Sequence, residues 1–280
     1  MARLAVSVGI PAYNEEKNIG RLLEALLAQK LDKIVIDEII VVSSGSTDRT
    51  DNIVREFSRR DSRIRLISEK ERKGKAKAVN RIISEAKNQV LVLESADTIP
   101  SEDAVEKLCS PFLSDDKVGM TCAHPIPTNR MDSFPGFYAH LIWRLHHCLN
   151  LLNPKGGEMI AFRRVITRIP DDTATDEAWI EYLVRRQGYK VVYVPEAVVK
   201  NRGPETLREI IRQRKRIAFG HIDLRRRTGY TVSSMRPALL VLALLSIMRS
   251  YRRAKEKIWC FLALVIEGIS RFLGWLDHIR

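Results

Sequence analysis

The stretch VLVLESADTIP, residues 90–100, joins a run of four aliphatic residues to a loop that carries carboxylates. Such a run predicts a strand buried on both faces of a sheet. The strand ends at Glu94, and Ser95, Ala96 and Asp97 follow before Pro100. A carboxylate at the edge of the core needs an explanation, which is either a helix cap or a ligand site.

Other strand-like and helix-like segments alternate around this strand. The strand-like runs are residues 4–10, 38–43, 64–68 and 89–93, and the helix-like runs are residues 15–29, 48–60 and 75–87. This alternation predicts an α/β fold with a mostly parallel sheet flanked by helices on both faces. Asn14 is a candidate cap of the first helix, and Ser46 or Thr47 is a candidate cap of the second.

The loops at the carboxyl ends of the strands are the first place to look for a site, because open α/β sheets bind their ligands there. These loops carry PAYNEE, SSGSTD, the segment after Ser68, and ESADT. We therefore expect the chemistry of this chain to be carried by these four loops.

Length and composition describe a globular protein with a charge imbalance. With 280 residues the chain has room for one large domain, or for a domain with an appendage. A hydrophobic fraction of 45% excludes a disordered chain. Forty-seven Lys and Arg residues against thirty-four Asp and Glu residues give a net charge of +13, which suits a polyanion, an anionic membrane face or a phosphorylated substrate.

The cysteines and the apolar runs indicate the compartment. Four scattered cysteines at positions 109, 122, 148 and 260 form no C-x-x-C pair, which argues against a zinc site or a disulfide framework and fits a reducing cytosol. The first residues predict a strand and no signal peptide. Residues 237–248 are too few to span a bilayer, and residues 258–276 are interrupted by Glu267 and Arg271, so no membrane-spanning run is expected.

The second half of the chain has a different pattern. After residues 118–123 the regular alternation stops, and an irregular section is expected to build the pocket of a second substrate. A basic helix follows Pro204, and short apolar helices begin near Ser233. We expect a catalytic domain at residues 1–232, with a nucleotide half at about 1–123 and an acceptor half at about 124–232, followed by a helical tail at 233–280.

Two interpretations stay open for each loop taken alone. Asp97 either caps a helix that starts near Pro100 or Ser101, or holds a divalent cation that neutralises a diphosphate. The SSGSTD loop is either an ordinary strand-to-helix turn or a turn whose backbone N–H groups meet a phosphate or a polar ring. Its single glycine, Gly45, does not make a dinucleotide-binding fingerprint.

The charged helix starts also have two interpretations. Arg72, Lys73, Lys75 and Lys77 surround Gly74 at a helix start, where cations oppose the helix dipole unless an anion is present; the alternative is a solvated basic turn. Asp176 and Glu177 open another helix, where acids are favoured in any case, but one of them could act as a general base.

The basic run QRKR, residues 213–216, is the last of these features. Gln213, Arg214, Lys215 and Arg216 are typical of an exposed helix face, and Arg geometry also suits bidentate phosphate contacts.

The order of these motifs along the chain is more specific than any one of them. IPAYNEEKNIGRLLEALL, IIVVSSGSTDRT, ERKGKAKAVN, ESADT, TDEAW and QRKRI, in this order over about residues 4–220, resemble family-2 glycosyltransferases of the GT-A fold. The resemblance implies an inverting transfer of a hexosyl or N-acetylhexosaminyl group from a UDP- or GDP-linked sugar. It also implies Mg²⁺ or Mn²⁺ on the diphosphate, and a saccharide or a lipid-linked molecule as the acceptor, in the synthesis of polysaccharide, glycolipid or glycoprotein glycans.

The resemblance also implies a role for individual residues. The residues implied to bind the nucleotide sugar are Pro11, Tyr13 and Glu15 around the nucleoside, Ser44 and Gly45 beside the base, Arg72 and Lys75 along the nucleotide, Ser95 and Asp97 at the diphosphate, and Gln213 and Arg216 facing the phosphates or the acceptor channel. Asp97 would be the main metal carboxylate, and Asp176 or Glu177 the catalytic base.

This chain departs from the family pattern at four places. Ser43 and Ser44 stand where the family usually has two acids before G-S-T-D, and Ser95 replaces the first acid of the D-x-D motif, which leaves Glu94 as a possible second acid. Ile217 replaces the Trp of Q-x-x-R-W, and the acid pair of the base motif is inverted to Asp176-Glu177.

Two alternatives to an active transferase follow. One is a catalytically silent relative of these enzymes, and the other is a basic module that binds membrane or nucleic acid. Under the transferase interpretation, no nucleic-acid partner is expected. The tail, with apolar residues 239–248 and 259–266 around Arg249, Arg252, Arg253, Lys255 and Lys257, predicts either packing on the domain or peripheral contact with the cytoplasmic membrane face.

Overall fold

The computed structural model describes residues 3–279, which form two compact units that are discontinuous in sequence. Within the described residues, the first unit comprises residues 3–125, 156–172 and 179–201, and the second comprises residues 126–155, 173–178 and 202–279. The sequential division expected from the sequence stays a prediction.

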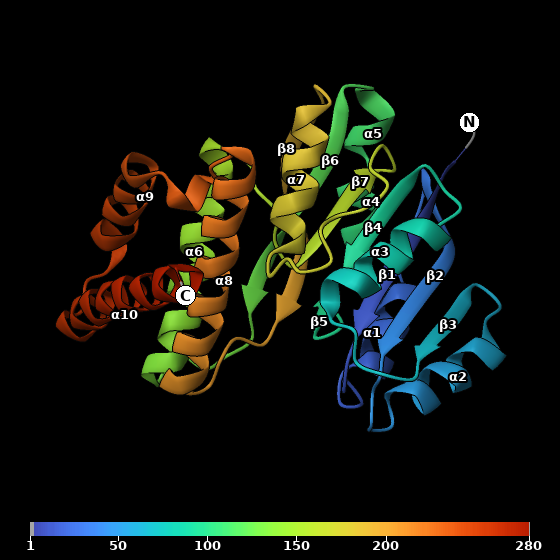
Figure 1. Cartoon of the computed structure of the whole chain (residues 1–280), viewed down its shortest axis with the longest axis horizontal. Coiled ribbons are helices and arrows are strands. Elements are labelled where there is room, and N and C mark those ends of the chain that lie inside the picture. The colour runs from blue at the N-terminus through green and yellow to red at the C-terminus, as the bar shows by residue number, and fades with distance from the viewer. Residues whose placement is uncertain (1–2, 280) are drawn as a thin grey trace. The chain divides into compact units, whose positions relative to one another are not determined.

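A mixed sheet of eight strands forms the first unit (Figure 1). In spatial order its strands are β3 (Ile64–Glu69), β2 (Ile34–Ser44), β1 (Leu4–Ala12), β4 (Val90–Glu94), β7 (Met159–Arg163), β6 (Val118–Pro127), β8 (Lys190–Asn201) and β5 (Thr98–Pro100). The pairs β2–β3, β1–β2 and β1–β4 are parallel, as the alternation of segments predicted. The pairs β4–β7, β6–β7 and β5–β8 are antiparallel, so the sheet is less parallel than expected.

Amphipathic helices cover this sheet. They are α1 (Ile19–Leu27), α2 (Thr50–Arg60), α3 (Lys75–Glu85), α4 (Ala104–Cys109), α5 (Pro111–Ser114) and α7 (Asp176–Arg186). In α1, buried Ile19, Leu22, Leu23 and Leu26 repeat at helical spacing and join the same apolar core as the buried strands. The first three crossovers therefore bring the ends of β1, β2 and β4 to one edge of the sheet.

The predicted caps are wrong, and their side chains hold two loops together instead. Helix α1 begins at Ile19, four residues after the predicted start, and Asn14 has a positive φ of 55°. The Asn14 Oδ1 atom accepts the N–H of Thr47 at 2.8 Å. At the start of α2, the Thr50 N–H donates to Asp48 Oδ1 at 2.9 Å, whereas the N-cap residue is Arg49 and neither Ser46 nor Thr47 caps the helix.

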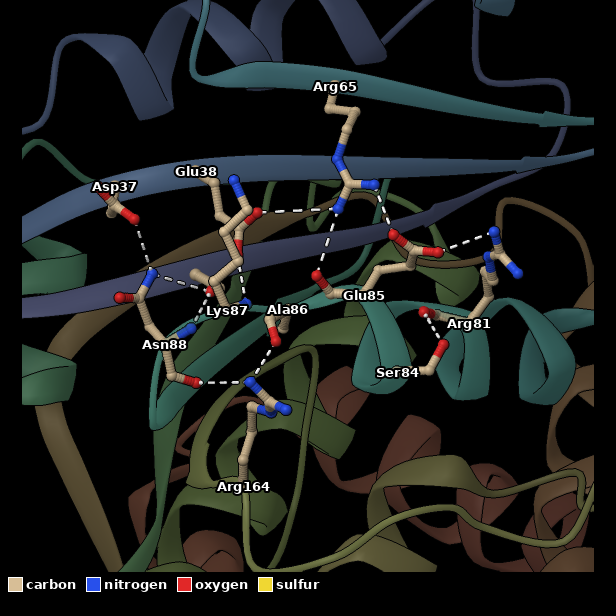
Figure 2. A network of polar contacts seen from close by, with 11 residues as sticks. Asp37, Glu38, Arg65, Arg81, Ser84, Glu85, Ala86, Lys87, Asn88 and Arg164 are labelled. Atoms are coloured by element: carbon tan, nitrogen blue, oxygen red, sulfur yellow. Dashed lines mark hydrogen bonds and ion pairs between the residues drawn. The ribbon is translucent and has the colours of Figure 1, made fainter.

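A buried polar network ties the sheet to the end of α3 (Figure 2). Glu38 is 5% exposed, and its Oε1 accepts the Ser7 hydroxyl at 2.7 Å and the Lys87 N–H at 2.6 Å. Arg65 lies 3.8 Å from the Glu38 carboxylate and donates to Glu85 at 2.5 Å. Since the oxygens of Glu38 meet donors on neighbouring segments, this buried carboxylate has a structural role.

Helices form the second unit (Figure 1). They are α6 (Phe134–Leu152), α8 (Leu207–Thr228), the 3₁₀ turn η1 (Ser233–Met235), α9 (Pro237–Ser250) and α10 (Ala254–Ile279). Helix α8 starts with a capping box between Thr206 and Glu209 and ends at Gly229 with a φ of 76°. Side chains of α6, α8, α9 and α10 share one apolar cluster, so the tail helices pack on this unit.

Helix α10 is longer than the sequence interpretation allowed. Among residues 3–279 it is the one helix that is long and apolar enough, by length and composition, to cross a membrane. The expectation that Glu267 and Arg271 interrupt the apolar run is wrong, because α10 continues through both residues, which lie one turn apart and 3.8 Å from each other. Both charges have protein partners: Glu267 accepts from Arg214 and Tyr138, and Arg271 donates to the Ser234 carbonyl.

Candidate functional site

The loops after β1 and β2 are joined by a ladder of hydrogen bonds. The N–H of Glu15 donates to Thr50 Oγ1 at 2.8 Å, and the N–H of Glu16 donates to Asp48 Oδ2 at 3.0 Å. The Asn14–Thr47 contact completes this ladder. The PAYNEE and SSGSTD motifs are therefore held side by side.

Three of the residues predicted to bind the nucleotide sugar lie close together at this edge. The guanidinium of Arg72 lies over the ring of Tyr13, 4.1 Å from its centroid. Gly45 has a φ of 67°, and a Cβ atom there would lie 2.4 Å from the backbone nitrogen of Arg72. Only glycine fits this approach, so Tyr13, Gly45 and Arg72 form one connected surface.

Two further residues predicted to bind the nucleotide sugar, Pro11 and Lys75, lie in β1 and at the start of α3. Pro11 is buried within β1, where it pairs with Val42 of β2. Lys75 is the exposed first residue of α3 and follows Gly74, which has a φ of 94°. The nucleotide-binding roles of these residues stay predictions.

The ESADT loop does not start a helix. Asp97 is exposed and leads into β5, and α4 begins at Ala104 after Asp103. The alternative that Asp97 caps a helix near Pro100 or Ser101 is therefore wrong. Asn18 donates to the carbonyl oxygens of Ala96 and Thr98 at 2.8 and 3.0 Å, which ties this loop to the start of α1.

Glu94 does not fit the role of a second metal acid. Its side chain is fully buried and receives a hydrogen bond from the Thr98 hydroxyl, while its Oε2 atom has no hydrogen-bond partner. Burial, with smaller contributions from Glu158 and Asp97, raises the pKa of Glu94 well above its ordinary value. This raised pKa disfavours the charged form of the carboxyl, whereas Mg²⁺ and Mn²⁺ favour charged or carbonyl oxygen ligands. Ser95 is also buried, and its N–H donates to the Glu158 carbonyl at 3.1 Å.

Glu15 and Asp97 are the pair that suits a divalent cation. Burial, together with the negative charges of Asp97 and Asp48, raises the pKa of Glu15 to about 7. Two carboxylates that repel each other at the edge of a sheet are what a cation would stabilise. No group of three or more His, Cys, Asp or Glu residues that could hold a metal occurs in residues 3–279. Mg²⁺ commonly binds through one or two carboxylates together with water and substrate phosphates.

Glu158 is a residue near this edge that sequence reasoning missed. It directly precedes β7, which pairs antiparallel with β4, and its charge contributes to the raised pKa of Glu94. The Asn201 amide donates to Glu158 Oε1 at 3.4 Å. The signal in the sequence was an acid immediately before a buried strand, in KGGEMIAF. The antiparallel pairing of β7 with β4, which brings Glu158 close to Glu94, is a tertiary feature.

The candidate base residues lie in the second unit. Asp176 is 4% exposed and Glu177 is half-buried in the first turn of α7. A Cβ atom at Gly220 of α8 would lie 2.6 Å from the Thr175 side chain, so α8 packs directly against the residue before Asp176. The choice between Asp176 and Glu177 stays open.

The QRKR run does not form a uniformly exposed face. Arg214 forms an ion pair with Glu267 of α10, in which its Nε lies 2.6 Å from Oε1, and its Nη2 donates to Oε2 at 3.0 Å. The Tyr138 hydroxyl also donates to Glu267. Burial alone would lower the pKa of Arg214, but the Glu267 charge raises it above its ordinary value. Gln213 is half-buried and Arg216 is exposed. The expectation of an exposed face is wrong for Arg214 because α10 covers it.

Comparisons with known proteins agree with this arrangement. The model of Glycosyl transferase family 2 matches residues 7–134. The model of Glycosyl transferase family group 2 matches residues 90–272, and this second match covers more than half of the chain. A poly-β-1,6-N-acetyl-D-glucosamine synthase from Staphylococcus aureus (strain COL) is 27% identical over 273 residues, which cover 92% of this chain and 63% of that protein. The chain thus spans less than two thirds of the length of this relative.

Solved structures share the fold. A mannosyltransferase from Pyrobaculum calidifontis, solved with GDP-Man and Mn²⁺, has a TM-score of 0.66 at 22% identity and covers 97% of this chain and 88% of its own. Glucosyl-3-phosphoglycerate synthase from Mycobacterium tuberculosis, solved with Mg²⁺ and UDP, has a TM-score of 0.56 at 25% identity over 82% of each chain. The eight-stranded sheet with its flanking helices is the GT-A fold, and the chain belongs to glycosyl transferase family 2.

Proposed function

We propose that this protein is an inverting glycosyltransferase that moves a hexosyl or N-acetylhexosaminyl group from a UDP- or GDP-linked sugar to an acceptor hydroxyl in glycan synthesis. The observation that carries the proposal is the gathering of Tyr13, Gly45 and Arg72 at the same sheet edge as the repelling pair Glu15 and Asp97. An aromatic and cationic surface suits a nucleoside, and the acidic pair suits a cation with a diphosphate. The relatives named above, which were solved with a nucleotide and a divalent metal, support the same donor class.

The cation would be Mg²⁺ or Mn²⁺, held by Asp97 with help from Glu15. When bound, such a cation stabilises the negative charge of a departing diphosphate. Arg72 and Lys75 lie along the nucleotide in this proposal, and their charges hold the phosphates against the sheet edge.

Asp176 or Glu177 takes the proton of the acceptor hydroxyl as its oxygen attacks the anomeric carbon. The bond between that carbon and the diphosphate oxygen breaks in the same displacement, so the configuration inverts. The acceptor is a saccharide or a lipid-linked molecule. Asp176→Asn and Glu177→Gln should each be assayed, and the base variant should lose transfer while it binds the donor as tightly as the parent.

The proposal is tested with UDP-, GDP- and dTDP-sugars, by thermal shift with and without Mn²⁺ and by release of the nucleoside diphosphate. We expect one donor to stabilise the protein only with metal, and Asp97→Ala to abolish this effect. Glu24→Gln, on the exposed face of α1, is the matched control. Donor binding by Asp97→Ala at the parent affinity, or no response to any donor, contradicts the proposal.

The same protein makes peripheral contact with the cytoplasmic membrane face in this proposal. Helices α9 and α10 bury Ala243, Ile247, Cys260 and Ala263, whereas their outer faces expose large apolar side chains. These exposed residues, here called the tail patch, are Val241, Leu242, Leu245 and Met248 of α9 and Ile258, Phe261, Leu262, Leu264, Val265, Ile269, Phe272, Trp275 and Ile279 of α10. Exposed Arg249, Arg252, Arg253, Lys255 and Lys257 lie in or beside the connection between the two helices.

This combination favours the interface of an anionic bilayer, where apolar side chains enter the headgroup boundary and cations meet lipid phosphates. Flotation with vesicles of anionic and of neutral lipid tests it. We expect Phe261→Asp to reduce binding to anionic vesicles, and Leu113→Asp, at an exposed apolar site on α5, to leave it unchanged. Absence of the parent from the floated fraction, with full activity after removal of residues 235–280, contradicts membrane contact.

A further inference from the structure

A partly hidden carboxylate stands beside Ser44 at the edge where the nucleoside is proposed to bind. Glu69 is the last residue of β3 and pairs in register with Ser44, the last residue of β2. The Ser44 hydroxyl donates to Glu69 Oε2 at 3.0 Å. The Glu69 side chain is 11% exposed, so this charge is largely withdrawn from water but still reaches the surface.

Hydrogen bonding leaves Ser44 with little to offer a ligand. Its single hydroxyl proton is directed to Glu69, and its oxygen accepts the N–H of Lys73 at 2.9 Å. Glu69 Oε1 has a longer contact, 3.4 Å, with the Lys73 ammonium. A carboxylate has about four lone-pair positions, so Glu69 can accept further hydrogen bonds from a ligand. Ser44 has no second hydroxyl proton to donate to a ligand.

The position of Glu69 connects it to the proposed nucleoside surface. Ser44 precedes Gly45, whose Cα faces the backbone of Glu71 and Arg72, and Arg72 covers the Tyr13 ring. Glu69 also borders a hollow of about 420 Å³, which is lined by residues 67–71, Lys73 and Arg81. A volume of this size lies within the range of small-molecule sites, about 300–1,000 Å³.

We propose that Glu69 selects the nucleobase of the donor by accepting a hydrogen bond from a ring N–H on the pairing edge of the base. Uracil, thymine and guanine present such an N–H, whereas cytosine and adenine present a ring nitrogen with a lone pair there. A carboxylate repels that lone pair, and a partly buried polar group left without its partner discriminates strongly between ligands. This inference rests on the proposed nucleotide-sugar donor and deepens it by assigning the base-selecting residue.

Calorimetry of UDP, GDP, CDP and ADP binding in the presence of Mn²⁺ tests the inference. We expect the parent to bind UDP or GDP at least about tenfold more tightly than CDP and ADP, which corresponds to about 1.4 kcal/mol. Glu69→Gln should reduce this ratio, because the amide can donate to the ring nitrogen of cytosine. Glu56→Gln, on the exposed face of α2, removes the same charge and should leave all four affinities unchanged.

Moving the carboxylate from position 69 to the paired position 44 separates a loss of base preference from a folding defect. Glu69→Ser should lose the preference, and the double variant Ser44→Asp/Glu69→Ser should regain it, since the carboxylate returns on the neighbouring strand. If the parent binds nucleotides but the Glu69 variants keep its base preference, the assignment of Glu69 is overturned and the proposed function stands. If the parent binds none of the four nucleotides, both are overturned.

Discussion

The charge of Glu15 gives a quantitative test of the acidic edge. Burial and the smaller contributions from the negative charges of Asp97 and Asp48 together raise the pKa of Glu15 from the ordinary 4.5 to about 7. Glu15→Gln keeps the size of the side chain and removes its charge. We therefore expect the variant to become more stable than the parent as the pH rises.

The magnitude follows from linkage between proton binding and folding. Between pH 4.5 and about 7 the unfolded chain has lost the Glu15 proton while the folded protein keeps it, so the free energy of unfolding of the parent falls as pH rises through this window. At about 1.36 kcal/mol per pKa unit, a rise from 4.5 to about 7 sets an upper limit of about 3.4 kcal/mol. The side chain is half-buried, and screening by solvent lowers the expected effect to about 1–2 kcal/mol.

Urea unfolding of the parent, Glu15→Gln and the control Glu24→Gln from about pH 5 to about pH 8 with a chelator measures this difference. The stability gain of Glu15→Gln should grow up to about pH 7 and then level off, while Glu24→Gln follows the parent. Added Mn²⁺ should reverse the order above pH 7, because only the parent offers both carboxylates to the cation. A gain that is independent of pH refutes the charge arrangement inferred for Glu15 and Asp97.

Three further substitutions test single contacts. Gly45→Ala should lower nucleotide affinity and destabilise by more than about 2 kcal/mol, since the new methyl group meets the backbone of Arg72 and Glu71 at an unfavourable φ. Gly74→Ala, where φ is 94° but nothing lies within 4 Å, should cost about 1–3 kcal/mol by thermal unfolding from backbone strain alone. Glu267→Ala leaves the buried Arg214 charge without its partner and should lower the free energy of unfolding in urea by about 3–5 kcal/mol. The control Asp277→Ala removes a more exposed ion pair with Lys215 and should lower it by at most about 1 kcal/mol. Glu38→Ala leaves the buried Ser7 hydroxyl and the Lys87 N–H without their acceptor and should cost about 2–3 kcal/mol without changing nucleotide affinity. A loss of affinity at constant stability contradicts its structural role.

Local patterns in the sequence were sufficient for the parallel half of the fold. Runs of β-branched and aliphatic residues marked β1 to β4, and apolar residues at helical spacing marked α1 to α3. Helix starts were less predictable. Asn14 and Thr47 have the side chains of caps, but each finds a better partner on the other loop, at a separation of 33 residues.

The sequence by itself determined the family, the first three crossovers and the edge at which Tyr13, Gly45, Arg72 and Asp97 lie, because hydrophobic periodicity and motif order are local properties of the chain. The tertiary structure alone decided the antiparallel β7 that brings Glu158 beside Glu94, the register that pairs Glu69 with Ser44, and the docking of α10 through Glu267 and Arg214. These features depend on pairings between distant segments, whose energies come from burial and charge in the folded state and leave no periodic signal along the chain.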